Sequence, residues 1–248
     1  LKQVAVALAQ LVNHAGKRRD RYGGQTGVPL VVRALFGAGR GYGASHSQSL
    51  ESWLVHVPGL KVVAPSTPSD ARRLLRAAIR DDNPVIFLEH KLVYGVKGLL
   101  SDGPVENQIS GCSKVVRPGS DVTLVGYAQA TQMVLKAAEE LSSRGVSAEV
   151  VDLPVLKPLD LGAAIASARK THRVVVVEEA PELCSVGSEI AYQLYQSCFG
   201  SLIAPIVKLS GKDTPVPSAT SIERAYLPQI EDVLTCVESL VSRPRVKG

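Results

Sequence analysis

The chain has 248 residues, of which 45% are hydrophobic and only 4% aromatic, a composition that suits one large or two ordinary α/β domains with a sizeable core. The formal net charge is +5, but the Lys and Arg residues are scattered rather than gathered with aromatics in a basic stripe, which argues against a nucleic-acid-binding protein. The four cysteines form no CxxC pair and no run of about 18 apolar residues occurs, so neither a zinc or redox motif nor a membrane span is predicted.

The N-terminal segment has apolar residues at helical spacing, which predicts an amphipathic helix over residues 2–16. This helix is already under way at the first residue, which is a leucine and not an initiator methionine. The segment also lacks the short apolar core and small-residue cleavage site of a signal peptide. We therefore expect a chain that is truncated at its N-terminus.

The next segments alternate between strand and helix patterns. Continuous apolar runs predict strands, buried on both faces, over residues 28–36, 59–66 and 83–90. Helical patterns follow the first two of these strands, over residues 46–57 and 67–81. Thr67 or Ser69 can cap the second helix, and Pro68 suits its first turn. This alternation predicts a parallel, doubly wound sheet.

Periodicity is lost over residues 95–119, which we interpret as a connector with one short strand. Strand patterns then return over residues 121–128, 146–154, 172–180 and 204–211. Helical patterns return over residues 131–145, 160–171, 187–199 and 221–243. The fold class is therefore α/β with two doubly wound units. We expect a first domain over residues 1–105, a linker over 106–118 and a second domain over 119–248.

A glycine-rich loop with the sequence GAGRGYG, residues 37–43, follows the first predicted strand. Its glycines are spaced by two, so Tyr42 stands where a dinucleotide-binding fingerprint requires its third glycine. A P-loop is also excluded, because no Gly-Lys-Ser/Thr follows. His46 comes just after this glycine loop, between a strand end and a helix start. It either caps the helix or acts as an acid/base or electrophilic imidazole.

Other polar residues of the strand ends are weaker candidates. His90 follows Glu89 at the end of a strand and is a second candidate for chemistry. The pair Glu178-Glu179 ends another strand, and its carboxylates either face a cleft or, as we favour, accept hydrogen bonds from helix N-terminal amides. We expect surface or capping roles for the remaining histidines, which are His14, His56 and His172.

Several motifs together resemble a known family. The segments GAGRGYGASHSQSLESW, RPGSDVTLVGYA, KTHRVVVVEEAP and GKDTPVPSATSIERAYLPQIEDV resemble the β subunit of the thiamine-diphosphate-dependent decarboxylating component of 2-oxoacid dehydrogenase complexes. The resemblance is to pyruvate and acetoin dehydrogenase β chains in particular, and it covers almost the whole chain. It implies part of a transketolase-like pyrimidine-binding domain over residues 1–105 and a transketolase C-terminal domain over residues 119–248.

The resemblance also implies partners and cofactors. The family forms an α2β2 heterotetramer that delivers its acyl group to a lipoyl acyltransferase core. Its α subunit holds thiamine diphosphate through Mg²⁺ with a Gly-Asp-Gly motif, which is absent from this sequence. The family implies a cytoplasmic location in a bacterium, and the mitochondrial matrix or plastid stroma in a eukaryote. Neither a nucleic acid nor a membrane is an expected partner.

Individual residues match functional positions of the family. His46 matches the histidine of its HSQ motif, which lies in the active-site channel and assists proton transfer and reductive acylation of the lipoyl group. Members of the family often bind a structural K⁺ ion. The resemblance implies that its ligands here would be Leu30, Ala78, Ile79, Asp81 and Asn83. A hard cation with oxygen ligands suits that set.

The sequence departs from the family at four places. Asp20 stands where many relatives have a tyrosine that lines the cofactor site, Ser218 stands where they often have tyrosine, and Pro154 stands where they often have arginine. The glutamate that activates the cofactor corresponds to a position upstream of residue 1. We expect an enzyme subunit whose first-choice substrate is pyruvate, with acetoin and branched-chain oxoacids as alternatives. A truncated, non-catalytic assembly subunit and a ketol transferase are the other hypotheses.

Overall fold

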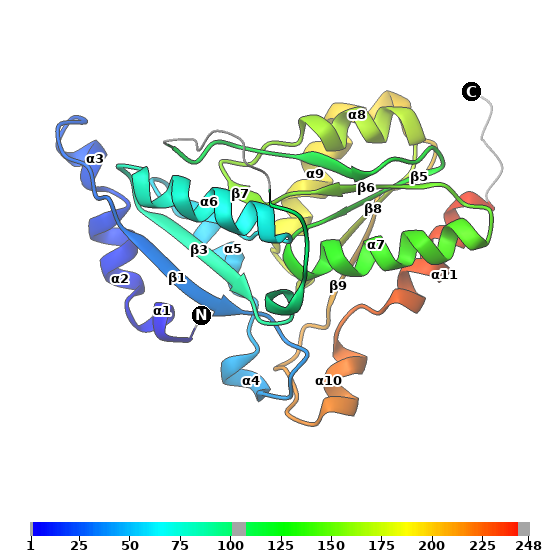
Figure 1. The fold of residues 1–248 in the computed structure, drawn as a ribbon, viewed down its shortest axis with the longest axis horizontal. Helices are drawn as coiled ribbons and strands as arrows, with labels where there is room; N and C mark the ends of the chain where they lie inside the picture. Colours follow the sequence, from blue (N-terminus) through cyan, green and yellow to red (C-terminus); the bar gives the residue numbers. More distant parts are fainter. Residues whose placement is uncertain (1, 101–107, 243–248) are drawn as a thin grey trace.

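The computed structural model describes residues 2–100 and 108–242 and contains two α/β sheets that lie side by side (Figure 1). The parts of the expected domains, linker and last helix that fall on residue 1, residues 101–107 and residues 243–248 lie outside the described residues. Each sheet has helices on both faces, so the predicted doubly wound α/β class is confirmed.

The first sheet has the strand order β1-β3-β2-β7. Its strands are β1 (Val31–Phe36), β2 (Lys61–Val63), β3 (Val85–His90) and β7 (Val155–Lys157). β1 and β2 pair with β3 in parallel, and every residue of β3 is buried, as its continuous apolar sequence predicts. β7 comes from the second half of the chain and pairs antiparallel with β2. The expected all-parallel sheet is therefore wrong at this edge.

Helices cover both faces of the first sheet. α6 (Pro68–Arg80) packs Leu74 and two alanines against β2 and β3. Its N-cap is Thr67, whose hydroxyl accepts the Asp70 N–H at 3.1 Å. α5 (Glu51–Val55) packs on the other face through Leu54. The expected helix over residues 46–57 is interrupted, because α4 (Gly43–His46) ends before a non-helical stretch at residues 47–50.

The N-terminal segment also differs from the continuous helix predicted for residues 2–16. It consists of α1 (Lys2–Val6), α2 (Leu8–Gln10) and a π-helical turn, η1 (Leu11–Ala15). The Gly16 N–H donates to the carbonyl of Leu11 at 2.8 Å, an i→i−5 bond that closes the wider turn. A short helix, α3 (Arg18–Arg21), follows.

The second sheet has the strand order β4-β6-β5-β8-β9. Its strands are β4 (Lys114–Arg117), β5 (Val122–Gly126), β6 (Ala148–Asp152), β8 (Val174–Pro181) and β9 (Val207–Gly211). Only β4 is antiparallel, and it lies in the segment that we interpreted as a connector with one short strand. The helices of this half are α7 (Ala128–Ser143), α8 (Gly162–Thr171), α9 (Val186–Cys198), α10 (Thr220–Tyr226) and α11 (Ile230–Val241).

The last predicted helix, residues 221–243, is in fact divided into α10 and α11. Pro228 lies in the break, since it has no N–H to donate and disfavours a helical conformation at the residue before it. Gln229 then begins α11 with a capping box, in which its own N–H donates to Asp232 at 2.8 Å.

The largest apolar cluster contains residues of both halves. Phe36 and Leu54 of the first half share it with Val125, Tyr127 and Ile190 of the second half. The two halves are therefore packed against each other through one continuous core. None of the helices among the described residues is long and apolar enough to cross a membrane.

Candidate functional site

The glycine loop, residues 37–43, connects β1 to α4 at the carboxyl end of the parallel strands. All four of its glycines have φ between +69° and +92°, a region that other residues rarely adopt. At Gly37 a side chain would also overlap the imidazole of His90. The glycines therefore serve the backbone conformation and the close approach of neighbouring groups, in agreement with the exclusion of a nucleotide-binding fingerprint.

His46 is exposed at the end of α4, directly after this glycine loop. Its Nδ1 lies 2.9 Å from the hydroxyl of Ser45, and Nε2 has no partner within the described part of the chain. Open α/β sheets bind their ligands outside the carboxyl ends of the strands, where this imidazole lies. An exposed imidazole with one nitrogen free is equipped to exchange a proton with a bound molecule.

His90, the second histidine candidate, is buried and has a structural partner. Its Nδ1 accepts the N–H of Leu92 at 3.2 Å, so the ring proton is on Nε2. Nε2 donates that proton to Glu179 of β8 at 2.8 Å. The same carboxylate oxygen accepts the N–H of Ala38 in the glycine loop at 3.1 Å. Glu179 thus accepts backbone and imidazole donors of the first half, and His90 is not available to a ligand.

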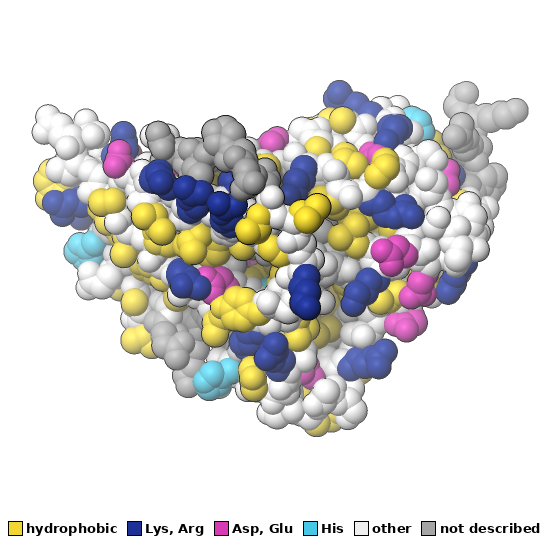
Figure 2. Space-filling view, viewed as in Figure 1, with side chains coloured by type: hydrophobic (Ala, Val, Ile, Leu, Met, Phe, Trp, Pro, Cys, Tyr) yellow, Lys and Arg dark blue, Asp and Glu magenta, His cyan; other side chains and the backbone are white. Residues whose placement is uncertain are grey.

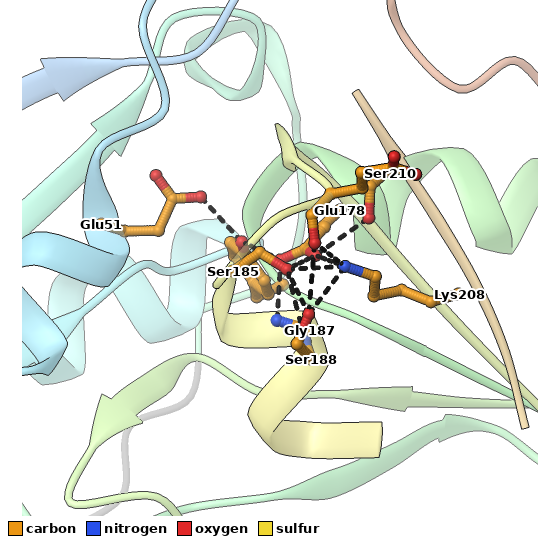
Figure 3. A network of polar contacts seen from close by, with 9 residues as sticks. Glu51, Glu178, Ser185, Gly187, Ser188, Lys208 and Ser210 are labelled. Atoms are coloured by element: carbon orange, nitrogen blue, oxygen red, sulfur yellow. Dashed lines mark hydrogen bonds and ion pairs between the residues drawn. The ribbon is translucent and has the colours of Figure 1, made fainter. Parts of the chain in front are cut away.

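Glu178 lies at the centre of a buried polar network (Figure 3). Its oxygens accept hydrogen bonds from the N–H of Gly187 at 2.8 Å, from the hydroxyl of Ser210 at 3.0 Å and from the hydroxyl of Ser185. The ammonium of Lys208 is 3.7 Å away. Ser185 and Gly187 belong to the N-terminus of α9, whose dipole favours a negative charge. This agrees with the structural role that we favoured, but for Glu178 alone, since the described donors to Glu179 are the Ala38 N–H and the His90 imidazole.

Glu51 lies on the other side of Tyr127 from Glu178. The Tyr127 hydroxyl is 2.7 Å from Glu51 and 3.1 Å from Glu178, and all three side chains are buried. A phenol has one proton and cannot donate to two carboxylates at once. Glu178 has several other donors, whereas the second oxygen of Glu51 has no partner. We therefore assign the Tyr127 proton to Glu51, to which the hydroxyl donates at the shorter distance.

Burial shifts the pKa values of this group. Burial raises the pKa of Glu51 to about 7, and this effect outweighs the opposing hydrogen bond from Tyr127. Burial also raises the pKa of Tyr127 well above its ordinary value. A third carboxyl group, Asp152, has its pKa raised by burial to about 6, although Ser66 and Thr131 donate hydrogen bonds to it.

The residues of the predicted potassium site lie together at the end of α6 and the loops beside it. Asp81 is fully buried, and its carboxylate accepts hydrogen bonds from Lys61 at 2.5 Å and from the N–H of Asn83 at 3.0 Å. Burial alone would raise the pKa of Asp81, but these donors lower it. The carbonyls of Leu30 and Ala78 accept backbone hydrogen bonds from Val85 and Asp81. Ile79 completes the set, with an exposed side chain.

Asp20 is exposed on α3, which precedes β1, whereas His46 follows β1 on α4. The two helices lie at opposite ends of that strand (Figure 1). Within one chain the structure therefore does not bring Asp20 and His46 together. The side chain of Arg19, next to Asp20, instead donates to Asn83 at 3.1 Å, beside the predicted potassium ligands.

Sequence reasoning did not identify Glu51, Tyr127 or Glu223 as members of the site. The signal for Glu51 was available, since this acidic residue interrupts the apolar pattern of a predicted helix. Glu223 is 1% exposed, and no local sequence pattern marks it as a site residue. Its carboxylate reaches the glycine loop because α10 packs beside α4. No group of three or more His, Cys, Asp or Glu side chains that could hold a metal ion occurs among residues 2–100 and 108–242.

Basic side chains gather in a row over α6 on one face of the molecule (Figure 2). The exposed arginines of this helix are Arg72, Arg76 and Arg80. Apolar side chains lie beside the row, where Leu75 and Tyr94 line a hollow of about 330 Å³.

Two family models match the chain. The transketolase pyrimidine-binding domain matches residues 6–97, and the transketolase C-terminal domain matches residues 111–233. A solved structure described as a split gene transketolase, inactive β4 tetramer, superposes with a TM-score of 0.72 over 98% of this chain and 74% of that one. At 22% identity this similarity concerns the fold alone.

Curated relatives are more similar in sequence. The chain is 43% identical to the mitochondrial pyruvate dehydrogenase E1 component subunit β-1 of Arabidopsis thaliana, over 92% of the chain and 64% of that protein. It is 42% identical to the corresponding β subunit of Rhizobium meliloti, over 94% of the chain and 51% of that protein. It is 41% identical to the acetoin:2,6-dichlorophenolindophenol oxidoreductase subunit β of Cupriavidus necator, over 99% and 71%. The chain thus spans half to two thirds of the length of the two pyruvate dehydrogenase subunits.

Proposed function

The chain belongs to the family that contains the β subunits of the pyruvate dehydrogenase E1 component and of acetoin:2,6-dichlorophenolindophenol oxidoreductase, and on that premise we propose that it is the β subunit of a thiamine-diphosphate-dependent 2-oxoacid dehydrogenase. Pyruvate is the proposed substrate, and the acyl group passes to a lipoyl group. The observation that carries the proposal is the exposed imidazole of His46, held by a glycine loop at the carboxyl edge of the first sheet.

The residues of this chain fit one side of a shared cofactor site. The glycine loop allows close approach of a ligand, and the free Nε2 of His46 lies beside it. The sequence lacks the Gly-Asp-Gly motif, and its described residues offer no metal-binding cluster, so we assign the diphosphate and Mg²⁺ to an α subunit. When bound, thiamine diphosphate supplies the carbanion stabilisation that 2-oxoacid decarboxylation requires.

His46 has a defined role in this proposal. Ser45 orients the ring through Nδ1, which leaves Nε2 to donate or accept a proton at the reacting group. The same position suits the delivery of a proton to the lipoyl sulfur during acyl transfer. Neither His90 nor Glu178 takes part, since both have internal partners.

The proposal includes the partners and the potassium ion that the family implies. We propose an α2β2 assembly that delivers acyl groups to a lipoyl acyltransferase core. The compartment would be the cytoplasm of a bacterium or an organelle of a eukaryote, as in the mitochondrial relatives. The oxygens of Asp81, Asn83, Leu30, Ala78 and Ile79 suit a hard cation such as K⁺. Lys61 already contacts one oxygen of Asp81, so the ion would bind beside an ion pair.

The test is an activity assay of the assembled enzyme. The full-length β chain would be co-expressed with its α subunit, and dye reduction measured with pyruvate, acetoin and a branched-chain 2-oxoacid in the presence of thiamine diphosphate and Mg²⁺. We expect turnover of pyruvate that falls by about 100-fold or more in His46→Ala. His56→Ala, at an exposed histidine of the same segment, is the matched control. A stable assembly with no turnover of any substrate would contradict the proposal and support a non-catalytic assembly subunit.

A further inference from the structure

The glycine loop that precedes His46 is held by charged groups from outside β1 and α4. Glu223 of α10 contacts its middle, and Lys91, which directly follows β3, contacts its first residue, Gly37, and also His46 beyond its end. We propose that Glu223 and Lys91 are positioning residues that fix this loop and thereby the imidazole of His46. The inference rests on the proposed function in one respect, namely that His46 is the reacting side chain.

Glu223 makes a buried, charge-assisted contact with the backbone. Its Oε2 accepts the N–H of Gly41 at 2.7 Å, and the side chain as a whole is 1% exposed. Its Oε1 has no partner among the residues that the structure describes. A carboxylate with so few donors is costly to bury, which indicates that it does not serve the stability of α10. Its defined contact is with the glycine loop, and a bond from a charged acceptor is about twice as strong as a neutral one.

The same side of the loop is packed closely against the second half of the chain. Ala38 is 2% exposed and forms a small apolar cluster with Val216 and Tyr226. Gly41 and Gly43 lie so near Ser218 that a side chain at Gly43 would overlap its hydroxyl. Figure 1 shows α4 and α10 next to each other at the lower edge of the molecule. Residues of the second half of the chain therefore pack along one side of the glycine loop.

Lys91 holds the loop from the first half. Its ammonium donates to the carbonyl of His46 at 2.5 Å and to the carbonyl of Gly37 at 3.5 Å. The first of these is a terminal carbonyl of α4, where a positive charge is favourable. The side chain is 9% exposed, and its Nζ lies 4.7 Å from the centre of the Tyr42 ring. The ammonium group of Lys91 is thus hydrogen-bonded both to Gly37, which begins the loop, and to His46, which follows the loop.

These contacts matter because the loop has little stiffness of its own. Four glycines within seven residues allow many backbone conformations, so external contacts must select one. A displacement of a catalytic group by about 1 Å can cost on the order of 100-fold in rate. Glu223 and Lys91 would therefore influence catalysis through the place of His46, without touching substrate or cofactor.

The test uses the full-length β chain assembled with its α subunit. Glu223→Ala removes the acceptor, whereas Glu223→Gln keeps an oxygen that can accept the Gly41 N–H. Hydrogen exchange of peptides covering residues 37–49 reports whether the loop is held, independently of any activity. We expect faster exchange there in Glu223→Ala, a kcat about 10- to 100-fold lower and a KM within about two-fold of the wild type. Glu223→Gln should restore most of both properties.

A double-variant comparison separates positioning from general destabilisation. In a His46→Ala background, Glu223→Ala should lower kcat no further, because there is no imidazole left to position. Lys91→Met should likewise lower kcat in the wild-type background and not in the His46→Ala background. If Glu223→Ala does not fold, the Lys91→Met variants alone test whether the loop is positioned by these contacts. Glu139→Ala, at an exposed position of α7, is the control and should change neither exchange nor rate.

Two results would overturn the inference. One is unchanged exchange of residues 37–49 in both Glu223→Ala and Lys91→Met. The other is a loss of rate in the His46→Ala background as large as in the wild type. If the wild-type assembly turns over no 2-oxoacid, the proposed function fails, and the exchange data still decide whether Glu223 and Lys91 hold the loop.

Discussion

The carboxyl group of Glu51 lies 2.7 Å from the phenolic oxygen of Tyr127, so a side chain of α5 in the first half is hydrogen-bonded to the residue before α7 in the second. Both side chains are buried in the interface between the halves. Because burial raises the pKa of Glu51 to about 7, its carboxyl group changes charge near neutral pH. The contact between the halves is consequently sensitive to pH.

Glu51→Gln should remove a pH dependence of stability. The folded pKa of about 7 exceeds the ordinary value of 4.5, so this group's stabilising contribution is fully present below pH 4.5 and is lost as the pH rises to 7. The loss for one such group is about 3 kcal/mol. The glutamine variant cannot ionise and should become more stable than the wild type above pH 7. Urea unfolding between pH 4.5 and 8.5 measures this, with the exposed Glu139→Gln as control, and parallel curves for wild type and Glu51→Gln would contradict the raised pKa of Glu51.

Tyr127→Phe should lower the free energy of unfolding by roughly 2 kcal/mol at pH 6, because the hydroxyl between the two carboxyl groups is lost while they remain buried. The loss should be smaller when Glu51 is already glutamine, because the Tyr127 hydroxyl then donates to a neutral amide oxygen, which is a weaker acceptor than a carboxylate. A double-mutant cycle with Glu51→Gln measures this coupling. Strictly additive effects would show that the three groups do not act together.

Gly37→Ala should destabilise the protein more than Gly24→Ala. Both glycines have positive φ, +85° and +81°, so each substitution strains the backbone by about 1–2 kcal/mol. Only at Gly37 would the new methyl group also overlap the ring of His90, whereas nothing lies within 4 Å at Gly24. Thermal unfolding of both variants compares the two costs. Equal melting temperatures would mean that His90 moves away freely, in spite of its bond to Glu179.

Potassium chloride should raise the melting temperature above that in choline chloride at the same ionic strength, if K⁺ binds at the proposed oxygens. An ion at 100 times its Kd stabilises the folded state by about 2.7 kcal/mol. Asp81→Asn should abolish the difference between the two salts, although it also removes the ion pair with Lys61 in both. An undiminished difference in Asp81→Asn would place the ion elsewhere.

Most helices and strands could be predicted from the sequence, because continuous apolar runs and helical spacing mark them directly. β3 and α6 are examples, and even the Thr67 cap was among the alternatives. The pairing of β7 was not predictable, since its three residues carry no strand pattern and its partner β2 is about 90 positions away in the sequence. Pro228 marks the break between α10 and α11 in the sequence. The helical spacing of apolar residues continues on both sides of it, and for that reason one continuous helix was predicted.

The site was predictable in part for the same reason. The position of His46, between a strand end and a helix start, follows from local sequence. Its neighbours Glu179 and Glu223 come from positions more than 130 residues away, and only the packing of the two halves brings them to the glycine loop. The raised pKa of Glu51 likewise depends on its burial against the second half of the chain, so no local pattern could reveal it.

The antiparallel edge strand β7 makes the folding of the first half depend on the second half. Val155 and Lys157 belong to the second half of the sequence, yet they pair with β2 in the first sheet. The first sheet is consequently incomplete until the chain has been synthesised well beyond the connector. If the backbone is cleaved between the halves after folding, the two fragments should remain associated. If residues 1–105 are expressed alone, β2 becomes an unpaired sheet edge, and we expect the fragment to aggregate. In this respect the two recognisable domains behave as a single unit of assembly.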